Sequence, residues 1–417
     1  EKLKMVKIKA FNAIRPKEKL AKYVAELPYD VVTYEEAVEK GKNKYSFIHV
    51  DKAEIDLDDN IDVYSDKVYK RAKENLDNMI DSGILIKDKK SCIYIYSETM
   101  NGKTQTGIVA CFSIDDYLNN NIKKHEYTTK KKEIDRINHV NTCNANTGPI
   151  FLTYKDNSEL ESIINACIQR GNIYSFISDD GIKHVCFKMD DENIIRNIIN
   201  VFYNIKSLYI ADGHHRAASA VEVGLKRRNE NKKFKGNEEF NYFLGIAFPH
   251  NQLNILAYNR VIKDLNGYSY DEFIRKVQEN FYINKLPLGT QYKPKEKGEF
   301  GMYLNNFWYR LKVKEDVLKD LDIVNNLDVS ILQNNILDPI LNIKDSRQDE
   351  RIEFVGEIKG LKELEIKVSE DFDVAFSMYP TSIDEIMEIA DNGFVMPPKS
   401  TWFEPKLRSG LFIHSLE

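Results

Sequence analysis

The sequence lacks the patterns that mark membrane proteins, disulfide-bonded proteins and P-loop nucleotide-binding proteins. No apolar run reaches the ~20 residues that a membrane-spanning helix needs. The five cysteines are scattered with no C-x-x-C pair, which argues against a disulfide framework and fits a reducing compartment. No G-x-x-x-x-G-K-[ST] loop is present, and Glu1–Lys4 shows no signal-peptide pattern. These absences predict a cytoplasmic protein that has no membrane partner.

An excess of positive charge is also missing. The formal net charge is −5, from 60 Lys and Arg against 65 Asp and Glu. Lysine-rich stretches such as 130–132 and 226–233 are interleaved with or flanked by acids and asparagines, which is typical of solvated surfaces. Dedicated nucleic-acid-binding proteins usually carry a basic excess or a basic stripe. We therefore expect no nucleic-acid partner.

What is present is the composition of an ordinary globular protein of more than one domain. The chain has 417 residues, of which 42% are hydrophobic and 30% charged. A chain of this length usually divides into two or three domains. Strand-like and helix-like segments alternate along it, which predicts the α/β or α+β class.

Local patterns predict several elements. Met5–Ala13 alternates like a strand, 17–26 is helix-like, and Val63–Ser82 is a long amphipathic helix. Asn101-Gly102 lies between two strand-like runs, 91–98 and 106–112, and predicts a hairpin. The stretch 125–154 is polar and has no clear periodicity. It predicts a loop region, either one that carries function or a solvated connector.

The most informative segment joins the apolar run Leu208–Ala211 to a helix-like run at Ala217–Val223. Between them stand Asp212, Gly213, His214, His215 and Arg216. A glycine turn at a helix N-terminus presents free backbone N–H groups and the positive end of the helix dipole, which favour a phosphate. Arg216 can add a two-pronged, charge-assisted contact. The segment therefore predicts a phosphate site, and the alternative is a structural turn with locally bonded histidines.

Asp212 is the unexpected member of this segment, because a carboxylate repels a phosphate unless a cation stands between them. A Mg²⁺ ion that bridges Asp212 and the phosphate would resolve the conflict, since Mg²⁺ prefers one or two carboxylates plus phosphate oxygens. The adjacent histidines could instead indicate zinc, but no third ligand has convincing spacing. Arg136 and Arg260 are weaker candidates for further neutralisation of charge.

Two other parts of the chain offer candidate functional residues. Glu18 lies in the first turn of a helix-like segment, where an acid by itself indicates only a favourable interaction with the helix dipole, and Asp30 follows a Pro-Tyr pair that suits a turn. Near the C-terminus, Lys399, Ser400 and Thr401 follow two prolines. A cation and two hydroxyl groups on a stiff segment suit a phosphate or a substrate carboxylate, and the alternative is a surface loop.

Three of these segments together resemble the free serine kinases, which have a ParB/sulfiredoxin-like fold. The Asp212–Arg216 segment matches the family's Asp-Gly-His-His-Arg motif, which follows a strand and precedes a helix. Pro16–Leu20 is similar to its Pro-x-Glu-x-Leu segment, and Pro380-Thr381 followed by 395–401 is similar to its C-terminal segment. The whole chain also resembles a large group of mostly uncharacterised bacterial proteins that share the Ala-Asp-Gly-His-His-Arg signature. That similarity includes Ala13–Pro16, Pro28–Val32, Pro398–Thr401 and Pro405-Lys406.

The resemblance implies a domain organisation. It places a ParB/sulfiredoxin-like catalytic domain at residues 1–265, with an insertion at about 44–190 that the short kinases lack. Residues 266–417 would form a C-terminal α/β lobe that completes the active site.

The resemblance also implies an activity, which is phosphorylation of free L-serine to O-phospho-L-serine by ADP, ATP or pyrophosphate. Glu18 would be the catalytic base, with Asp30 as the competing base. Asp212 and His215 would be catalytic, with Mg²⁺ at Asp212, and Gly213, His214, His215 and Arg216 would hold the phosphoryl group. Lys399, Ser400, Thr401 and Asp30 would bind the substrate. Open alternatives are the reverse reaction, a ParB-like nucleotide-dependent DNA-binding or regulatory module, and a phosphate sensor without turnover.

Overall fold

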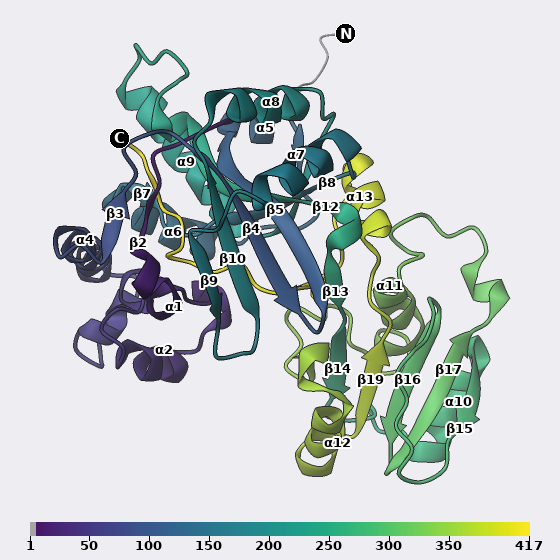
Figure 1. The fold of residues 1–417 in the computed structure, drawn as a ribbon. Helices are drawn as coiled ribbons and strands as arrows, with labels where there is room; N and C mark the ends of the chain where they lie inside the picture. The colour runs from purple at the N-terminus through teal and green to yellow at the C-terminus, as the bar shows by residue number, and fades with distance from the viewer. Residues whose placement is uncertain (1–5) are drawn as a thin grey trace. The chain divides into compact units, whose positions relative to one another are not determined.

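Strands and helices alternate along residues 6–417, which are the residues that a computed structural model describes (Figure 1). The α/β class expected from the sequence is therefore confirmed. The expected strand Met5–Ala13 is reduced to β1 (Ile8–Lys9), and Met5 and the segment Glu1–Lys4 lie outside the described residues. No helix among the described residues is both long and apolar enough to cross a membrane.

The chain forms two units with boundaries that differ from the expected ones. Unit 1 runs up to Leu253 and takes in Pro405–Glu417, and unit 2 is Asn254–Glu404. The expected boundary at 265 falls inside unit 2 because β14 (Tyr258–Ile262) pairs with two strands of the second sheet. The last 13 residues were expected in the C-terminal lobe. They belong to unit 1 because they pair with its strands, as at His414 and Asn146.

Unit 1 is built on one large mixed sheet in the order β6-β11-β8-β12-β5-β4-β10-β9, with β1 beside β5. Most neighbours are antiparallel, whereas β6–β11 and β8–β12 are parallel. The strands of the path are β4 (Ile93–Met100), β5 (Lys103–Ser113), β6 (Ile122–Lys123), β8 (Ile150–Tyr154), β9 (Tyr174–Ile177), β10 (Lys183–Met189), β11 (Leu208–Asp212) and β12 (Tyr242–Pro249).

Three helices cover one face of this sheet. They are α7 (Ser158–Ile168), α8 (Glu192–Tyr203) and α9 (His214–Glu230), and their apolar side chains share one buried cluster with the strands. The cluster includes Leu160, Phe202 and Ala217 from the three helices. Removal of this apolar surface from water, at about 25 cal/mol per Å², is the main stabilisation of the arrangement. The start of α9 is thereby fixed at the end of β11.

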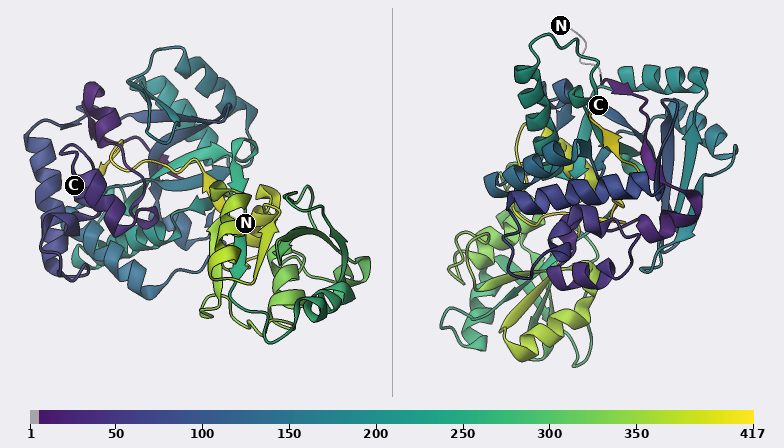
Figure 2. Two further views of the ribbon diagram at one scale, coloured as in Figure 1. Left: turned by 90° about the horizontal axis from the view of Figure 1, so that it is seen from below. Right: turned by 90° about the vertical axis from the view of Figure 1, so that its left-hand side faces the viewer.

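A second buried cluster of unit 1 gathers short elements around α4 (Asp66–Asp81), the long helix in the right-hand view of Figure 2. It contains side chains from α1 (Ala21–Val24), α3 (Ile48–Asp51), β2 (Ile14–Pro16), β3 (Leu85–Lys87) and β7 (Ala145–Asn146). The remaining short elements of unit 1 are η1 (Glu18–Leu20), η2 (Tyr29–Val31), α2 (Tyr34–Gly41), η3 (Ala53–Asp56), α5 (Ile114–Leu118), η4 (Glu239–Asn241), η5 (His250–Gln252) and β21 (His414–Ser415).

Some sequence expectations are confirmed and two are wrong. The long helix is α4, and the hairpin is β4–β5, whose turn residues Asn101 and Gly102 both have positive φ. The expected helix at 17–26 is only the short pieces η1 and α1. The expected loop at 125–154 contains a full helix, α6 (Lys130–Cys143).

Unit 2 has its own six-stranded antiparallel sheet, in the order β15-β17-β16-β19-β14-β18. Its core includes Val261, Trp308 and Leu364. The elements of unit 2 are β13 (Asn254–Leu256), β14, α10 (Tyr270–Asn280), β15 (Phe281–Lys285), β16 (Glu299–Leu304), β17 (Phe307–Val313), η6 (Glu315–Leu318), α11 (Asp328–Leu332), η7 (Gln333–Leu337), β18 (Ile352–Gly356), η8 (Glu357–Lys359), α12 (Leu361–Glu370), β19 (Val374–Met378), α13 (Ile383–Asp391) and β20 (Trp402–Glu404).

Candidate functional site

The turn between β11 and α9 has the geometry of an anion site. Gly213 is the N-cap of α9, with φ of 91° and no side-chain cap. Within residues 6–417, no group accepts a hydrogen bond from the backbone N–H of His214, His215 or Arg216. These N–H groups stand at the positive end of a 17-residue helix, so the turn can bind a phosphate through its backbone.

The Asp212 carboxylate has two partners. Its Oδ2 lies 3.0 Å from the Lys406 ammonium, and its Oδ1 accepts the Gly213 N–H at 2.8 Å. Burial by itself would raise the pKa of Asp212, but the charges of Lys406 and Arg216 outweigh burial and hold the pKa well below its usual range. Asp212 is therefore an ionised, neutralised carboxylate at the mouth of the turn.

Arg216 folds back over the turn. A Cβ on Gly213 would lie 3.2 Å from its guanidinium, and Nη1 donates to the Pro149 carbonyl at 2.5 Å. The Nε–H is buried and makes no hydrogen bond to a described residue. Glycine at 213 thus meets two requirements, a left-handed backbone and room for the guanidinium. Arg216 keeps donors for an anionic group beside it.

The two histidines of the turn are uncharged in this setting and hold a neighbouring loop. The Nε2 of His215 accepts the Thr129 N–H at 3.1 Å, and the Nε2 of His214 accepts the His125 N–H at 3.5 Å. Burial, together with nearby positive groups, lowers the pKa of both rings. The positive charge of the site therefore comes from Arg216 and Lys406, whereas the histidines can contribute hydrogen bonds only.

His125 stands edge to face against His214, with ring centroids 4.5 Å apart. It is 1% exposed, and neither ring nitrogen makes a hydrogen bond of normal geometry to a described residue. Burial lowers its pKa to about 4. The loop that starts at His125 thus covers the N-terminus of α9.

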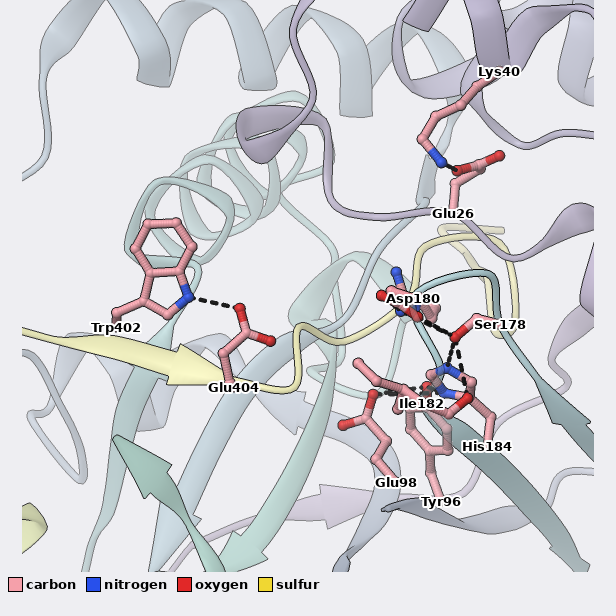
Figure 3. Close-up of polar contacts among 11 residues, drawn as sticks. Glu26, Lys40, Tyr96, Glu98, Ser178, Asp180, Ile182, His184, Trp402 and Glu404 are labelled. Carbon is pink, nitrogen blue, oxygen red and sulfur yellow. Dashed lines mark hydrogen bonds and ion pairs between the residues drawn. The ribbon is translucent and has the colours of Figure 1, made fainter. Parts of the chain in front are cut away.

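Lys406 is held in place by its neighbours in the C-terminal segment. Arg408, two residues later, forms an ion pair with Asp180 and donates to Ser178 Oγ at 3.3 Å. Ser178 lies 2.9 Å from His184 Nε2, and His184 Nδ1 lies 2.7 Å from the Tyr96 hydroxyl (Figure 3). This buried polar network ties the segment to β4 and β10.

The two candidate bases differ in their surroundings. Glu18 is exposed at the start of η1, and its carboxylate makes no hydrogen bond or ion pair to the described part of the chain. Asp30 lines a cavity with Tyr29, and its charge acts on His215. Asp30 is therefore within electrostatic reach of the β11–α9 turn.

Lys399, Ser400 and Thr401 belong to unit 2. Lys399 is exposed and has a left-handed backbone with φ of 53°, and its carbonyl accepts a hydrogen bond from Arg260 at 3.1 Å. The Ser400 hydroxyl donates to the Pro397 carbonyl at 2.6 Å. Their approach to the β11–α9 turn stays a prediction.

The expected magnesium ion at Asp212 stays a prediction. The ion was expected because a carboxylate beside a phosphate needs a counter-charge, and Lys406 supplies that charge at 3.0 Å. Both oxygens of Asp212 already have a donor. Among residues 6–417 there is also no group of three His, Cys, Asp or Glu side chains that could hold a metal.

Sequence reasoning missed Lys406 and His125 as members of the site. Lys406 lies 194 positions from Asp212, so no local pattern could connect the two residues. Pro405-Lys406 did appear in the resemblance, but without a role. His125 opens the polar stretch that was interpreted as a loop or connector, and its density of polar residues was the available signal.

Comparisons with known proteins place the chain in a family. No curated protein matches it. Among solved structures, a mutant free serine kinase in complex with ADP is 14% identical, with 73% of this chain and 92% of that chain covered and a TM-score of 0.35. SbnI from Staphylococcus aureus with a C-terminal truncation is 11% identical (73% and 86% covered, TM-score 0.38), and a conserved hypothetical protein from Pyrococcus furiosus is 14% identical (73% and 94%, 0.34). The model of the family described as "Protein of unknown function (DUF1015)" matches residues 8–330, well over half of the sequence, so the chain belongs to the DUF1015 family.

Proposed function

We propose that this protein is a kinase that transfers a phosphoryl group to the hydroxyl of free L-serine, with ADP, ATP or pyrophosphate as the donor. Three separated motifs support the proposal, at Pro16–Leu20, Asp212–Arg216 and 395–401, in the order found in free serine kinases. The geometry of the β11–α9 turn supports it independently of that resemblance.

The observation that carries the proposal is the combination of free N–H groups, Arg216 and Lys406 at the start of α9. Phosphoryl transfer depends mainly on positioning and on stabilisation of charge that spreads over the phosphoryl oxygens. Backbone N–H groups and a guanidinium can supply that stabilisation, and Lys406 prevents Asp212 from opposing it. His214 and His215, as neutral rings, would add hydrogen bonds.

In the proposed reaction the serine hydroxyl oxygen forms the new bond to phosphorus while the bond to the leaving phosphate of the donor breaks. The hydroxyl proton passes to a carboxylate, and the bond's electron pair leaves with the donor product. The resemblance assigns the proton to Glu18, and the electrostatic link between Asp30 and His215 favours Asp30. Lys399, Ser400 and Thr401 would bind substrate from unit 2.

The proposal is tested by incubating the full chain with L-serine and each donor in turn, with Mg²⁺ and with EDTA in parallel reactions. Phosphoserine, detected by mass spectrometry, is the expected product with at least one donor. The reverse direction is tested with phosphoserine and AMP, ADP or inorganic phosphate. Absence of product with every donor in both directions would overturn the kinase proposal.

A further inference from the structure

Two adjoining cavities lie inside unit 1 next to the β11–α9 turn. Their volumes are about 250 Å³ and about 30 Å³, and both are lined by Tyr29, Asp51, Arg136 and His139. Arg216 also lines the smaller one, and Asp30 the larger one. The cavities are thus adjacent to residues of the proposed transfer site.

The cationic wall of this space is Arg136 on α6. It is 8% exposed, its Nε donates to Asp135 at 2.8 Å, and its guanidinium lies 3.9 Å from the centre of the Tyr29 ring. Burial opposes the charged form, but Asp135 and Tyr29 outweigh burial and raise the pKa of Arg136. Its two terminal nitrogens make no hydrogen bond to the described residues, so they are available to a carboxylate in the cavity.

The most deeply buried carboxyl group of the larger cavity is Asp51, the last residue of α3. It is 5% exposed and accepts the Thr147 hydroxyl at 3.1 Å, and Ser409 is a second hydrogen-bonding neighbour. The pKa of Asp51 lies above its usual value, because burial outweighs the hydrogen bonds of Ser409 and Thr147 and the charges of Arg136 and Arg216. A buried carboxylate without a direct ion pair is costly unless a cation reaches it.

His139 also lines both cavities, but it cannot be the cation that neutralises Asp51. The His139 Nε2–H donates to the Val50 carbonyl at 2.9 Å, and burial lowers the pKa of His139 to about 3. The ring therefore stays neutral. Besides Arg136 and Asp51, the larger cavity is lined by charged residues of both signs, and Tyr29 lies beside Arg136; the further charged residues are Asp30, Lys52, Glu54, Lys132 and Asp135.

We propose that this cavity binds a free α-amino acid as a zwitterion, with its carboxylate on Arg136 and its ammonium on Asp51. Arg136 and Asp51 line the same cavity and can carry opposite charges, which suits a ligand that has both a carboxylate and an ammonium group. Both residues lie in the segment that the short serine kinases lack.

The identification of this amino acid with the phosphoryl acceptor rests on the proposed function. Tyr29 and Asp30 join the cavity to the turn, since the charge of Arg216 acts on Tyr29 and that of Asp30 acts on His215. A side chain that extends from the bound amino acid toward Asp30 would therefore extend toward the N-terminus of α9, where Arg216 lines the smaller cavity.

The test is calorimetric titration of the full chain with L-serine, with and without ADP. Asp51→Asn and Arg136→Lys are each expected to weaken binding at least tenfold. Asp116→Asn and Arg228→Lys are matched controls, because Asp116 is a buried carboxylate and Arg228 a hydrogen-bonded arginine of the same unit outside the cavity. Both controls should bind as the unmodified protein does.

Ligand analogues keep the proposal falsifiable if the variants unfold. N-acetyl-L-serine lacks the ammonium and L-serine methyl ester lacks the carboxylate, so both should bind at least tenfold more weakly than L-serine. Equal binding of the analogues, no binding of any amino acid with or without ADP, or unchanged binding in folded Asp51→Asn and Arg136→Lys would each overturn the pocket. If L-serine binds but no donor yields phosphoserine, only the kinase proposal is overturned. If phosphoserine forms and both variants have an unchanged KM for serine, only the pocket is overturned.

Discussion

At the residue scale, the pairing of Asp212 with Lys406 decides what the β11–α9 turn can bind. Without Lys406, the turn would place the uncompensated Asp212 carboxylate beside an incoming anion. When Lys406 is present, the Asp212–Lys406 pair is close to neutral, and Arg216 gives the turn a net positive charge. Removing one partner of a half-buried ion pair leaves the other charge uncompensated, which costs more than removing both. The contribution of Lys406 to anion binding can therefore be measured by replacing Lys406 with and without the Asp212 carboxylate present.

Replacing Lys406 by methionine is expected to weaken binding of inorganic phosphate roughly tenfold, a loss of about 1.4 kcal/mol. The cause would be repulsion from an uncompensated Asp212. Titration calorimetry of a double-mutant cycle tests this cause; the cycle consists of Lys406→Met, Asp212→Asn and the double variant. The double variant should recover part of the lost phosphate affinity. Lys9→Met is the control, because Lys9 forms a similar ion pair with Glu239 elsewhere in unit 1. If Lys406→Met binds phosphate normally, the pair has no part in anion binding.

The choice of base is a second prediction at this scale. Glu18→Gln and Asp30→Asn both preserve shape and remove a proton acceptor, so the variant that lacks the true base should lose turnover by about 10²-fold or more. Binding of phosphate should change little in either. Steady-state phosphoserine formation measures the effect. A fully active Glu18→Gln with an inactive Asp30→Asn would assign the base to Asp30, and the opposite result would assign it to Glu18.

Residues that are neighbours in the chain could be predicted as a site, and residues that only the fold brings together could not. Asp212 to Arg216 are consecutive, so the pattern of strand, glycine turn and helix predicts their shared position from the sequence alone. Lys406 and Arg136 reach the same region through strand pairing and helix packing, and no local rule encodes such contacts. The two histidines were correctly placed at the turn, but their burial and neutrality depend on the loop at 125–129.

At the element scale, α6 shows why a helix can be missed. Its buried residues are Arg136, His139, Val140 and Cys143, which follow the i, i+3, i+4, i+7 spacing of an amphipathic helix. Two of the four are polar, so the apolar periodicity that predicts a helix is absent. By contrast α4 buries an unbroken apolar stripe and was found at nearly its observed length. The buried polar members of α6 are the ones that line the proposed amino-acid pocket.

Asp328, at the start of α11, is expected to make the stability of unit 2 depend on pH. Its carboxylate accepts the Gly298 N–H at 3.0 Å, it is 8% exposed, and burial raises its pKa from 3.8 to about 7. Between about pH 4 and pH 7 the folded state binds more protons at this group than the unfolded state. The free energy of unfolding of unit 2 should therefore fall as the pH rises through this range, by at most about 4 kcal/mol.

Asp328→Asn should remove most of this slope and make unit 2 more stable than the unmodified protein at pH 8. Urea unfolding followed by tryptophan fluorescence measures it, because both tryptophans of the chain, Trp308 and Trp402, belong to unit 2. Glu370→Gln, at an exposed carboxylate at the end of α12, should keep the slope. A slope that persists in Asp328→Asn would place the titrating group elsewhere.

At the scale of the whole molecule, the chain leaves unit 1 at Leu253, builds unit 2 and returns at Pro405. The returning segment is integral to unit 1, because Ser409 exchanges two backbone hydrogen bonds with Glu26 and Ile413 exchanges two with Ile14. It also carries Lys406 to Asp212. Unit 2 is therefore an insertion within the fold of unit 1, and the residues of the β11–α9 turn and of the proposed amino-acid pocket all belong to unit 1.

This organisation predicts that unit 1 folds and binds ligands without unit 2. A variant in which a flexible Gly/Ser linker of about ten residues replaces 254–404 should bind inorganic phosphate and L-serine nearly as tightly as the full chain. It should not form phosphoserine, because Lys399, Ser400 and Thr401 would be gone.

A chain truncated after Glu404 is the contrasting variant, and it should lose folded unit 1 together with β21 and Lys406. Circular dichroism measures folding, calorimetry measures ligand binding, and mass spectrometry detects phosphoserine. Full turnover in the linker variant would make the Lys399–Thr401 segment dispensable, and loss of phosphate binding in a folded linker variant would show that the anion site needs both units.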